Sequence, residues 1–183
     1  VQRSTRSYAG ATFAAWLTLG AAALLTTFAV TGAIIGVRPW YDPQYVIPLC
    51  GMVLGNTLTG LSLCLDTLLE ALDRDRAAIE LRLCLGATSW EACRPAMRDA
   101  VRRGMVPILN SMTVVGVVSL PGMMTGQILA GADPLQAVKY QIVVMFMLAA
   151  TTALGCIAMT LLAFRSLFNH QHQLQGSKIL RRP

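Results

Sequence analysis

The sequence predicts an all-α, polytopic membrane protein with four transmembrane helices and a charged helical segment between the second and third of them. Hydrophobic residues make up 55% of the chain and charged residues only 13%, whereas a soluble domain carries roughly 25% charged residues. Charged residues are absent from four long stretches, and the basic residues gather on one side of the implied topology. These observations argue against a soluble enzyme, a disordered chain and a nucleic-acid-binding protein.

Four stretches lack Asp, Glu, Lys and Arg altogether, and they comprise residues 7–37, 43–65, 105–132 and 140–164. Each is longer than the roughly 20 residues that a helix needs to cross the hydrocarbon core of a bilayer. We therefore predict one membrane domain with transmembrane helices at about residues 11–37, 45–66, 105–130 and 141–164. Buried helices of a soluble bundle are the alternative, but these would be shorter and amphipathic.

The orientation follows from the Lys and Arg residues, of which the chain has 15. All but Arg38 and Lys139 precede the first predicted helix or lie in the segment 67–104 or the tail 165–183. Such an asymmetry places the basic side in the cytoplasm. Both ends of this chain are therefore expected on the cytoplasmic side of the inner (plasma) membrane. The chain begins with Val and shows no charged region followed by a short apolar stretch and a cleavage site, so we also expect further helices upstream.

Glycine pairs at four-residue spacing occur in three of the predicted helices. They are Gly32 and Gly36, Gly51 and Gly55, and Gly122 and Gly126. Such pairs let helix backbones approach closely in a membrane, and they predict a tight helical bundle or a dimer.

The third predicted helix is interrupted by Pro121 and Gly122. Proline removes a backbone donor, and freed carbonyls in a membrane are tolerated only against protein or a water-filled cavity. Either this is a broken helix that lines a transport site, or the helix ends near the outer surface and a short interfacial piece follows. Polar and thioether side chains gather around it, and the candidate translocation path comprises Asn56, Asn110, Ser111, Met112, Pro121, Gly122, Met123, Met124 and Gln127.

No pattern in the sequence indicates catalysis, and the chain is expected not to be an enzyme. It has no HExxH or GxSxG motif, no acid pair within a predicted helix and no CxxC pair among its five cysteines. His170 and His172 are the only histidines, and on a basic tail they are more often solvated than metal-bound. The sequence leaves any metal ligands unknown.

The segment 67–104 has a helical pattern. Gly86 is expected to end one helix, and the run Thr88 to Glu91 has the spacing of a capping box that begins the next. Pro95 is expected to kink or end that short helix. A further helix over residues 96–103 would then lead into the third transmembrane helix.

Several motifs resemble the FetB (YbbM) family of ABC-transporter permeases, over about residues 40–168. Residues 120–131 read Leu-Pro-Gly-Met-Met-Thr-Gly-Gln-Ile-Leu-Ala-Gly, residues 107–112 read Pro-Ile-Leu-Asn-Ser-Met, and residues 40–43 read Trp-Tyr-Asp-Pro. Glu80 and Gly86 have the spacing of the Glu-Ala-Ala loop, the coupling helix with which ABC-importer permeases dock onto their ATPase, although Leu81 and Arg82 replace the alanines.

The resemblance implies the permease subunit of an ATP-driven exporter, with iron as the expected cargo and roles in metal homeostasis and oxidative-stress resistance. The chain lacks a GxxxxGK[ST] phosphate loop, so it is expected to bind no cofactor, with ATP and Mg²⁺ held by a separate FetA-like ATPase. Two copies of the permease are expected to form a homodimer in the lipid bilayer. No nucleic-acid partner is expected. The residues expected to couple to the ATPase are Glu80, Gly86, Ala87, Thr88, Trp90 and Glu91.

Alternatives remain open for the cargo and for the energy source. Plant relatives are linked to aluminium tolerance, and one has been proposed to move a nucleotide sugar, so another metal or a nucleotide sugar is an alternative substrate. A membrane scaffold, sensor or passive channel without an ATPase is a second alternative. Family members are longer, with about seven transmembrane helices where this chain has four.

Overall fold

The computed structural model describes residues 6–8, 16, 18–22, 43–116, 121–168 and 179–181. The described residues are nearly all helical, as the sequence predicts. The elements are β1 (Arg6–Tyr8), α2 (Pro43–Arg74), α3 (Arg76–Cys84), α4 (Ser89–Val114), α5 (Gly122–Leu129), α6 (Pro134–Leu167) and β2 (Ile179–Arg181). The exception to the predicted all-α class is the short antiparallel pair of β1 and β2, in which Ser7 lies opposite Leu180.

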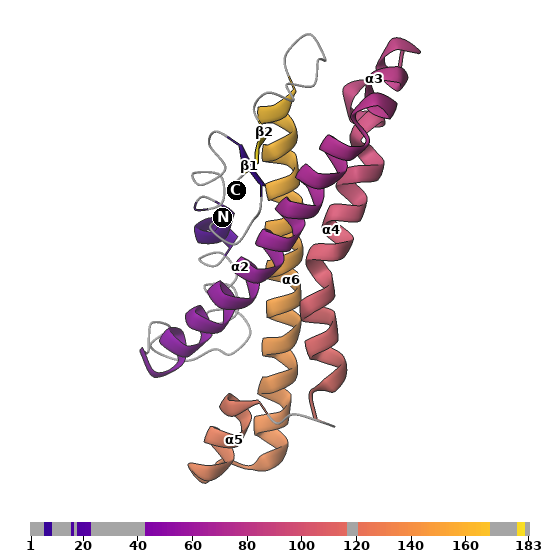
Figure 1. Cartoon of the computed structure of the whole chain (residues 1–183). Helices are drawn as coiled ribbons and strands as arrows, with labels where there is room; N and C mark the ends of the chain where they lie inside the picture. Colours follow the sequence, from indigo (N-terminus) through magenta and orange to yellow (C-terminus); the bar gives the residue numbers. More distant parts are fainter. Residues whose placement is uncertain are drawn as a thin grey trace.

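Three long helices, α2, α4 and α6, pack along one another and form the body of the molecule (Figure 1). The short helices lie at opposite ends of this bundle. Helix α5 packs against the first part of α6, and α3 continues α2 before the chain turns back into α4. The bundle therefore has a charged end at the turn between α3 and α4 and an apolar end at α5.

The three long helices approach most closely at glycines. A Cβ atom on Gly60 of α2 would lie 2.5 Å from the Thr152 side chain of α6 and 3.0 Å from the Gly104 carbonyl of α4. A Cβ atom on Gly155 would lie 3.2 Å from the Thr57 methyl group. These glycines allow backbones to meet where any larger residue would separate them.

The predicted glycine pairs among the described residues do not make these contacts within one chain, and their use in a dimer stays a prediction. A Cβ atom on Gly51, Gly55, Gly122 or Gly126 would meet nothing within 4 Å. The pair at residues 32 and 36 lies outside the described residues. The spacing of small residues identified helices that tolerate close approach, but the shape of the bundle selects which glycines are used.

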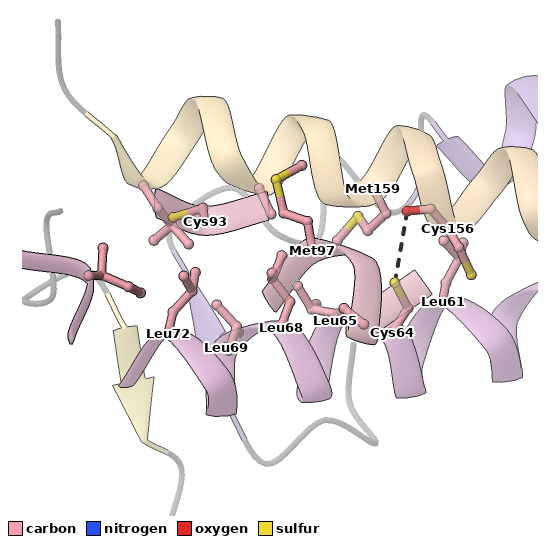
Figure 2. Close-up of a cluster of buried hydrophobic side chains, with 14 of the residues drawn as sticks. Leu61, Cys64, Leu65, Leu68, Leu69, Leu72, Cys93, Met97, Cys156 and Met159 are labelled. Atoms are coloured by element: carbon pink, nitrogen blue, oxygen red, sulfur yellow. Dashed lines mark hydrogen bonds between the residues drawn. The ribbon is translucent and has the colours of Figure 1, made fainter. Parts of the chain in front are cut away.

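The largest buried cluster occupies the half of the bundle nearest α3. Figure 2 shows leucines of α2, among them Leu65 and Leu68, facing Met97 of α4 and Met159 of α6. The Cys64 thiol lies 3.8 Å from the Cys156 carbonyl oxygen, which it approaches as a donor. A second cluster, centred on Leu49, Val144 and Leu148, fills the half nearest α5.

Two described helices, residues Ile47–Arg74 of α2 and Pro134–Leu167 of α6, are long and apolar enough to cross a membrane. They include the second and fourth predicted transmembrane segments. Most of the first predicted segment, 11–37, lies outside the described residues, as do the histidines of the tail. The third predicted segment, 105–130, is divided between the last part of α4 and the separate helix α5.

The helix that enters this third segment begins earlier than the sequence predicts. Helix α4 runs without a break from Ser89 to Val114 and contains both Pro95 and Pro107. The expectation that Pro95 ends a short helix is therefore wrong, whereas the alternative, a kink at Pro95, stays a prediction. The chain leaves the helix at Val115, which has an extended conformation, and Gly116 has a φ of 84°. The interruption thus precedes Pro121, which is the N-cap residue of α5.

Candidate functional site

A cavity of about 570 Å³ opens between α2, α5 and the start of α6, and we call it the α5 cavity. The described residues that line it include no charged side chain; polar groups come from Gln127, Gln136 and Tyr140, and thioethers from Met52 and Met123. Helix α5 positions the first of these residues because Pro121 begins it and Gly131, with a φ of 89°, ends it. The volume is within the range of small-molecule sites in proteins.

A second cavity of about 330 Å³, the α4 cavity, lies between α2, the end of α4 and α6. Asn56, Ser111 and Pro121 line it, and Met52 lines both cavities. The Asn56 amide donates to the Met52 carbonyl at 2.9 Å, and the Ser111 hydroxyl donates to the Pro107 carbonyl at 3.0 Å. These bonds hold the donors on their own helices and leave the acceptor oxygens of both side chains available to the cavity.

The structure therefore brings together six of the nine predicted path residues. Asn56, Ser111 and Pro121 share the α4 cavity, and Gly122, Met123 and Gln127 line the α5 cavity. The remaining three, Asn110, Met112 and Met124, line neither of these two cavities. The break between α4 and α5 places polar residues at the boundary of the two cavities.

Four buried polar atoms near the middle of the bundle and near α5 have no hydrogen-bond partner among the described residues. They are the Thr57 hydroxyl oxygen, the Gln127 amide oxygen and both amide atoms of Gln141. Gln141 is only 4% exposed. Most buried polar groups in proteins are bonded, so unpartnered ones call for an explanation such as a ligand or water. Gln141 and Thr57 are not among the predicted path residues, although Gln141 is an amide within an apolar stretch and Thr57 is a polar residue of the second predicted helix.

No group of three or more His, Cys, Asp or Glu side chains that would hold a metal ion is present among the described residues. The five cysteines are all free thiols. Burial raises the pKa of the Cys93 thiol to about 12, which keeps this side chain protonated at neutral pH and disfavours its use as a metal ligand. Thioether, amide and hydroxyl groups are the ligands that the described lining of the cavities offers.

The opposite end of the bundle presents a compact turn between α3 and α4. Gly86 has a φ of 90°, the Ala87 amide donates to the Arg82 carbonyl and the Gly86 amide donates to the Leu83 carbonyl. This is the Schellman pattern, and it confirms that Gly86 ends the helix. Thr88 and Glu91 form the predicted capping box, in which each side chain bonds to the other residue's backbone amide.

Apolar side chains project from this turn. Leu85 is 78% exposed and Leu81 is 61% exposed, and we call these two leucines the apolar tip. Because the turn beside them is fixed, these two leucines are a candidate docking surface. Neither leucine is among the predicted coupling residues. Helical periodicity does not distinguish an apolar residue that is buried in the bundle from one that remains exposed.

The predicted coupling residues lie around the apolar tip, but they differ in environment. Glu80 is exposed and accepts a hydrogen bond from Arg76 at 2.7 Å on the preceding turn of α3. The Trp90 ring packs edge-to-face on the ring of Phe164 of α6, with ring centroids 5.6 Å apart. Ala87 and Thr88 lie in the turn itself. Trp90 therefore joins the turn to a long apolar helix.

Comparison with known proteins gives consistent matches over most of this chain. The family described as "Uncharacterised protein family (UPF0014)" matches residues 1–168. A UPF0014 membrane protein of Synechocystis is 46% identical over 87% of this chain and 61% of its own length. A probable iron export permease protein, FetB, of Escherichia coli is 39% identical over 86% of this chain and 59% of its own length.

A plant relative extends the comparison. Protein ALUMINUM SENSITIVE 3 of Arabidopsis thaliana is 35% identical over 89% of this chain and 59% of its own length. The chain thus spans about three fifths of the length of these relatives. No solved structure matches it significantly. From the extent of the family match and the similarity to these relatives, we conclude that the chain belongs to the UPF0014 family of membrane proteins.

Proposed function

We propose that this chain is part of the permease subunit of an ATP-driven exporter, with iron as its cargo. The relative from Escherichia coli is named a probable iron export permease, and that name suggests the cargo. ATP and Mg²⁺ would be bound by a separate ATPase subunit. Two copies of the permease would offer two docking turns to an ATPase dimer in the inner membrane.

The observation that carries the proposal is the apolar tip at the end of the bundle. An ATPase can transmit motion only through a surface that is exposed and held rigidly. The Schellman turn at Gly86 and the capping box of Thr88 and Glu91 fix the backbone on both sides of Leu85. The contact of Trp90 with Phe164 would pass a displacement of the turn on to α6.

The two cavities are the proposed translocation path. Helix α6 lines both of them, so a tilt of α6 would change the two volumes together. Gln127, whose amide oxygen has no hydrogen-bond partner among the described residues, would contact the cargo in the α5 cavity. The neutral oxygen and sulfur groups of the described lining would bind the cargo there.

The deciding experiment measures ATP-dependent iron accumulation in inside-out vesicles that contain the full-length permease and its ATPase. We expect accumulation that disappears when the phosphate-loop lysine of the ATPase is replaced. Gly86→Val, which places a β-branched residue at a positive φ, is expected to abolish transport while membrane insertion is retained. If an intact, ATP-hydrolysing complex accumulates no iron, iron is rejected as the cargo, whereas the proposal that the chain belongs to a permease still stands.

A second candidate keeps the ATPase but changes the cargo. One relative carries the name ALUMINUM SENSITIVE 3, and the α5 cavity is large enough for a small organic molecule. The same vesicles, tested with Al³⁺ and with a nucleotide sugar, distinguish these cargos from iron. A scaffold or passive channel would show no dependence on ATP with any of them.

A further inference from the structure

We propose that the groove between α4 and α6 binds the headgroup of an anionic phospholipid. The groove has a volume of about 350 Å³ and lies on the opposite half of the bundle from the α5 cavity. Its lining combines the cationic residues Arg94 and Arg98 with apolar residues of both helices. We call it the arginine groove, and its residues are Trp90, Arg94, Met97, Arg98, Val101, Ile157, Thr160 and Leu161.

The two arginines are available to a ligand. Arg94, Arg98 and Arg102 follow one another at four-residue spacing, so they form one stripe along α4. None of the three forms an ion pair with a described residue, whereas Arg74 pairs with Asp75 and Arg76 pairs with Glu80. Closely spaced guanidinium groups without a counter-charge repel one another and attract a phosphate, which they bind in a bidentate manner.

The nearest carboxylates are directed elsewhere. Glu91 precedes Arg94 by three residues, but the Thr88 amide and hydroxyl donate to its carboxylate at 2.9 and 2.8 Å. Asp99 directly follows Arg98, so it lies about 100° away from it around the helix, and it forms no ion pair with a described residue. The arginine groove is therefore a site of net positive charge that the described residues leave uncompensated.

The depth of the groove matches the headgroup region. Gly104 of α4 and Cys156 of α6 are in contact at the inner end of the charge-free part of α4. About 20 residues of α6 on the α5 side of Cys156 suffice to cross the hydrocarbon core. Ile157 and Leu161, which line the groove, then lie at the inner boundary of the core, within the predicted segment 141–164 and one to two helical turns before Arg165. This placement rests on the orientation in the proposed function.

Apolar groups continue from the arginines toward the core. Leu154, Ile157 and Leu161 are exposed and recur at three- and four-residue spacing, which makes one stripe on α6. Trp90 and Phe164 meet at the charged end of the groove, as aromatic residues do at membrane interfaces. An anionic phospholipid would place its phosphate between Arg94 and Arg98 and an acyl chain along the leucine and isoleucine stripe. Basic pockets between helices on the cytoplasmic side bind such headgroups in other membrane proteins.

The test measures lipid binding to the full-length protein in detergent, which depends neither on transport nor on an ATPase. Phosphatidylglycerol and phosphatidylcholine with identical acyl chains are added, and lipid retention is measured by native mass spectrometry. We expect the wild type to retain phosphatidylglycerol preferentially. The double variant R94Q/R98Q is expected to bind it roughly 25-fold more weakly, about fivefold for each basic side chain. The matched control R74Q/R76Q removes the same charge and should keep the preference.

Three results would overturn the proposal. The first is equal retention of the two lipids by the wild type. The second is a preference for phosphatidylglycerol that survives in R94Q/R98Q. The third is an equal loss of this preference in R74Q/R76Q, which would indicate an effect of total charge alone. Full displacement of the lipid by millimolar inorganic phosphate would assign the arginines to free phosphate instead. A benzophenone residue in place of Leu161 should crosslink to lipid. Crosslinking only to another part of the chain or to a second copy would show that protein covers the groove.

Discussion

Gly104 of α4 lies so close to α6 that a Cβ atom at this position would be 2.8 Å from the Cys156 sulfur. The same atom would lie 2.8 Å from the Cys64 Cβ atom of α2. The three long helices therefore meet at a point where only glycine fits between two buried thiols. This point lies between the arginine groove and the two cavities, so the packing here sets the relative positions of the sites.

Gly104→Ala is expected to destabilise the protein, because the added methyl group overlaps two neighbours that are themselves buried. Overpacking of this kind costs about 1–3 kcal/mol. Gly55→Ala is the matched control, since a Cβ atom there meets nothing within 4 Å and alanine favours the helix by roughly 1 kcal/mol. Thermal unfolding in detergent measures both variants. Equal unfolding temperatures for the two would contradict the close packing at Gly104.

Leu85→Asp is expected to weaken binding of the ATPase while leaving the bundle folded. The side chain is exposed at the apolar tip, so a carboxylate there costs little in the isolated permease but would be buried without a partner in the complex. Ala77→Asp introduces the same charge on an exposed residue in the first turn of α3 and serves as the control. Co-purification with the tagged ATPase is the measurement. Undiminished recovery with Leu85→Asp would remove the apolar tip from the docking surface.

Protonation of Glu91 is expected to weaken the α3–α4 turn at acidic pH. Hydrogen bonds from the Thr88 amide and hydroxyl hold the pKa of this carboxyl below its ordinary value of 4.5. Because the folded-state pKa is lowered, the stabilisation is fully present above about pH 4.5 and is lost as the pH falls through the folded-state pKa.

The measurement for Glu91 is the unfolding temperature of wild type and Glu91→Gln between pH 6 and pH 3. Glutamine retains the shape of the capping box but does not titrate. The wild type should be more stable at pH 6, and the difference should shrink as the pH falls. A difference that is constant over this range would mean that the Glu91 charge does not stabilise the turn.

Gln141→Leu is expected to raise thermal stability, because it replaces a buried amide of which neither polar atom has a partner among the described residues. An unpartnered buried polar group costs about 1–3 kcal/mol. Thr151→Val is the control on the same helix. The Thr151 hydroxyl is also buried but donates to the Met147 carbonyl at 2.7 Å, so its loss should give no gain. A fall in stability for Gln141→Leu would show that the amide has a partner in the membrane.

Much of the fold is predictable from the sequence because charged residues and glycines influence the structure of the chain segment in which they occur. A long stretch without charge predicts a long apolar helix whatever surrounds it, and α2 and α6 follow that rule. Gly86 and the run from Thr88 to Glu91 also act locally, through backbone conformation and neighbouring amides, and both are found as predicted. One alternative of the Pro95 prediction fails, because α4 continues through this residue instead of ending there.

The candidate site also has features that the sequence predicts and features that only the packing of the helices decides. The sequence identified polar and thioether residues around the break before α5, but their spacing does not reveal which of them share a cavity. Ser111 reaches the α4 cavity whereas the adjacent Asn110 does not, because successive residues on a helix point in different directions. The arginine groove was likewise invisible, since Arg94 and Ile157 are brought together only by packing of α4 on α6.

The sequence by itself determined the class of protein, the long helices α2 and α6 and the turn at Gly86, because hydrophobicity, charge and backbone preference belong to individual residues. Only the tertiary structure decided which glycines the helices use to approach one another. It also decided that Leu81 and Leu85 remain exposed while Leu65 and Leu68 are buried. The physical reason is that burial and close contact depend on the positions of neighbouring helices, which residues far apart in the chain determine together.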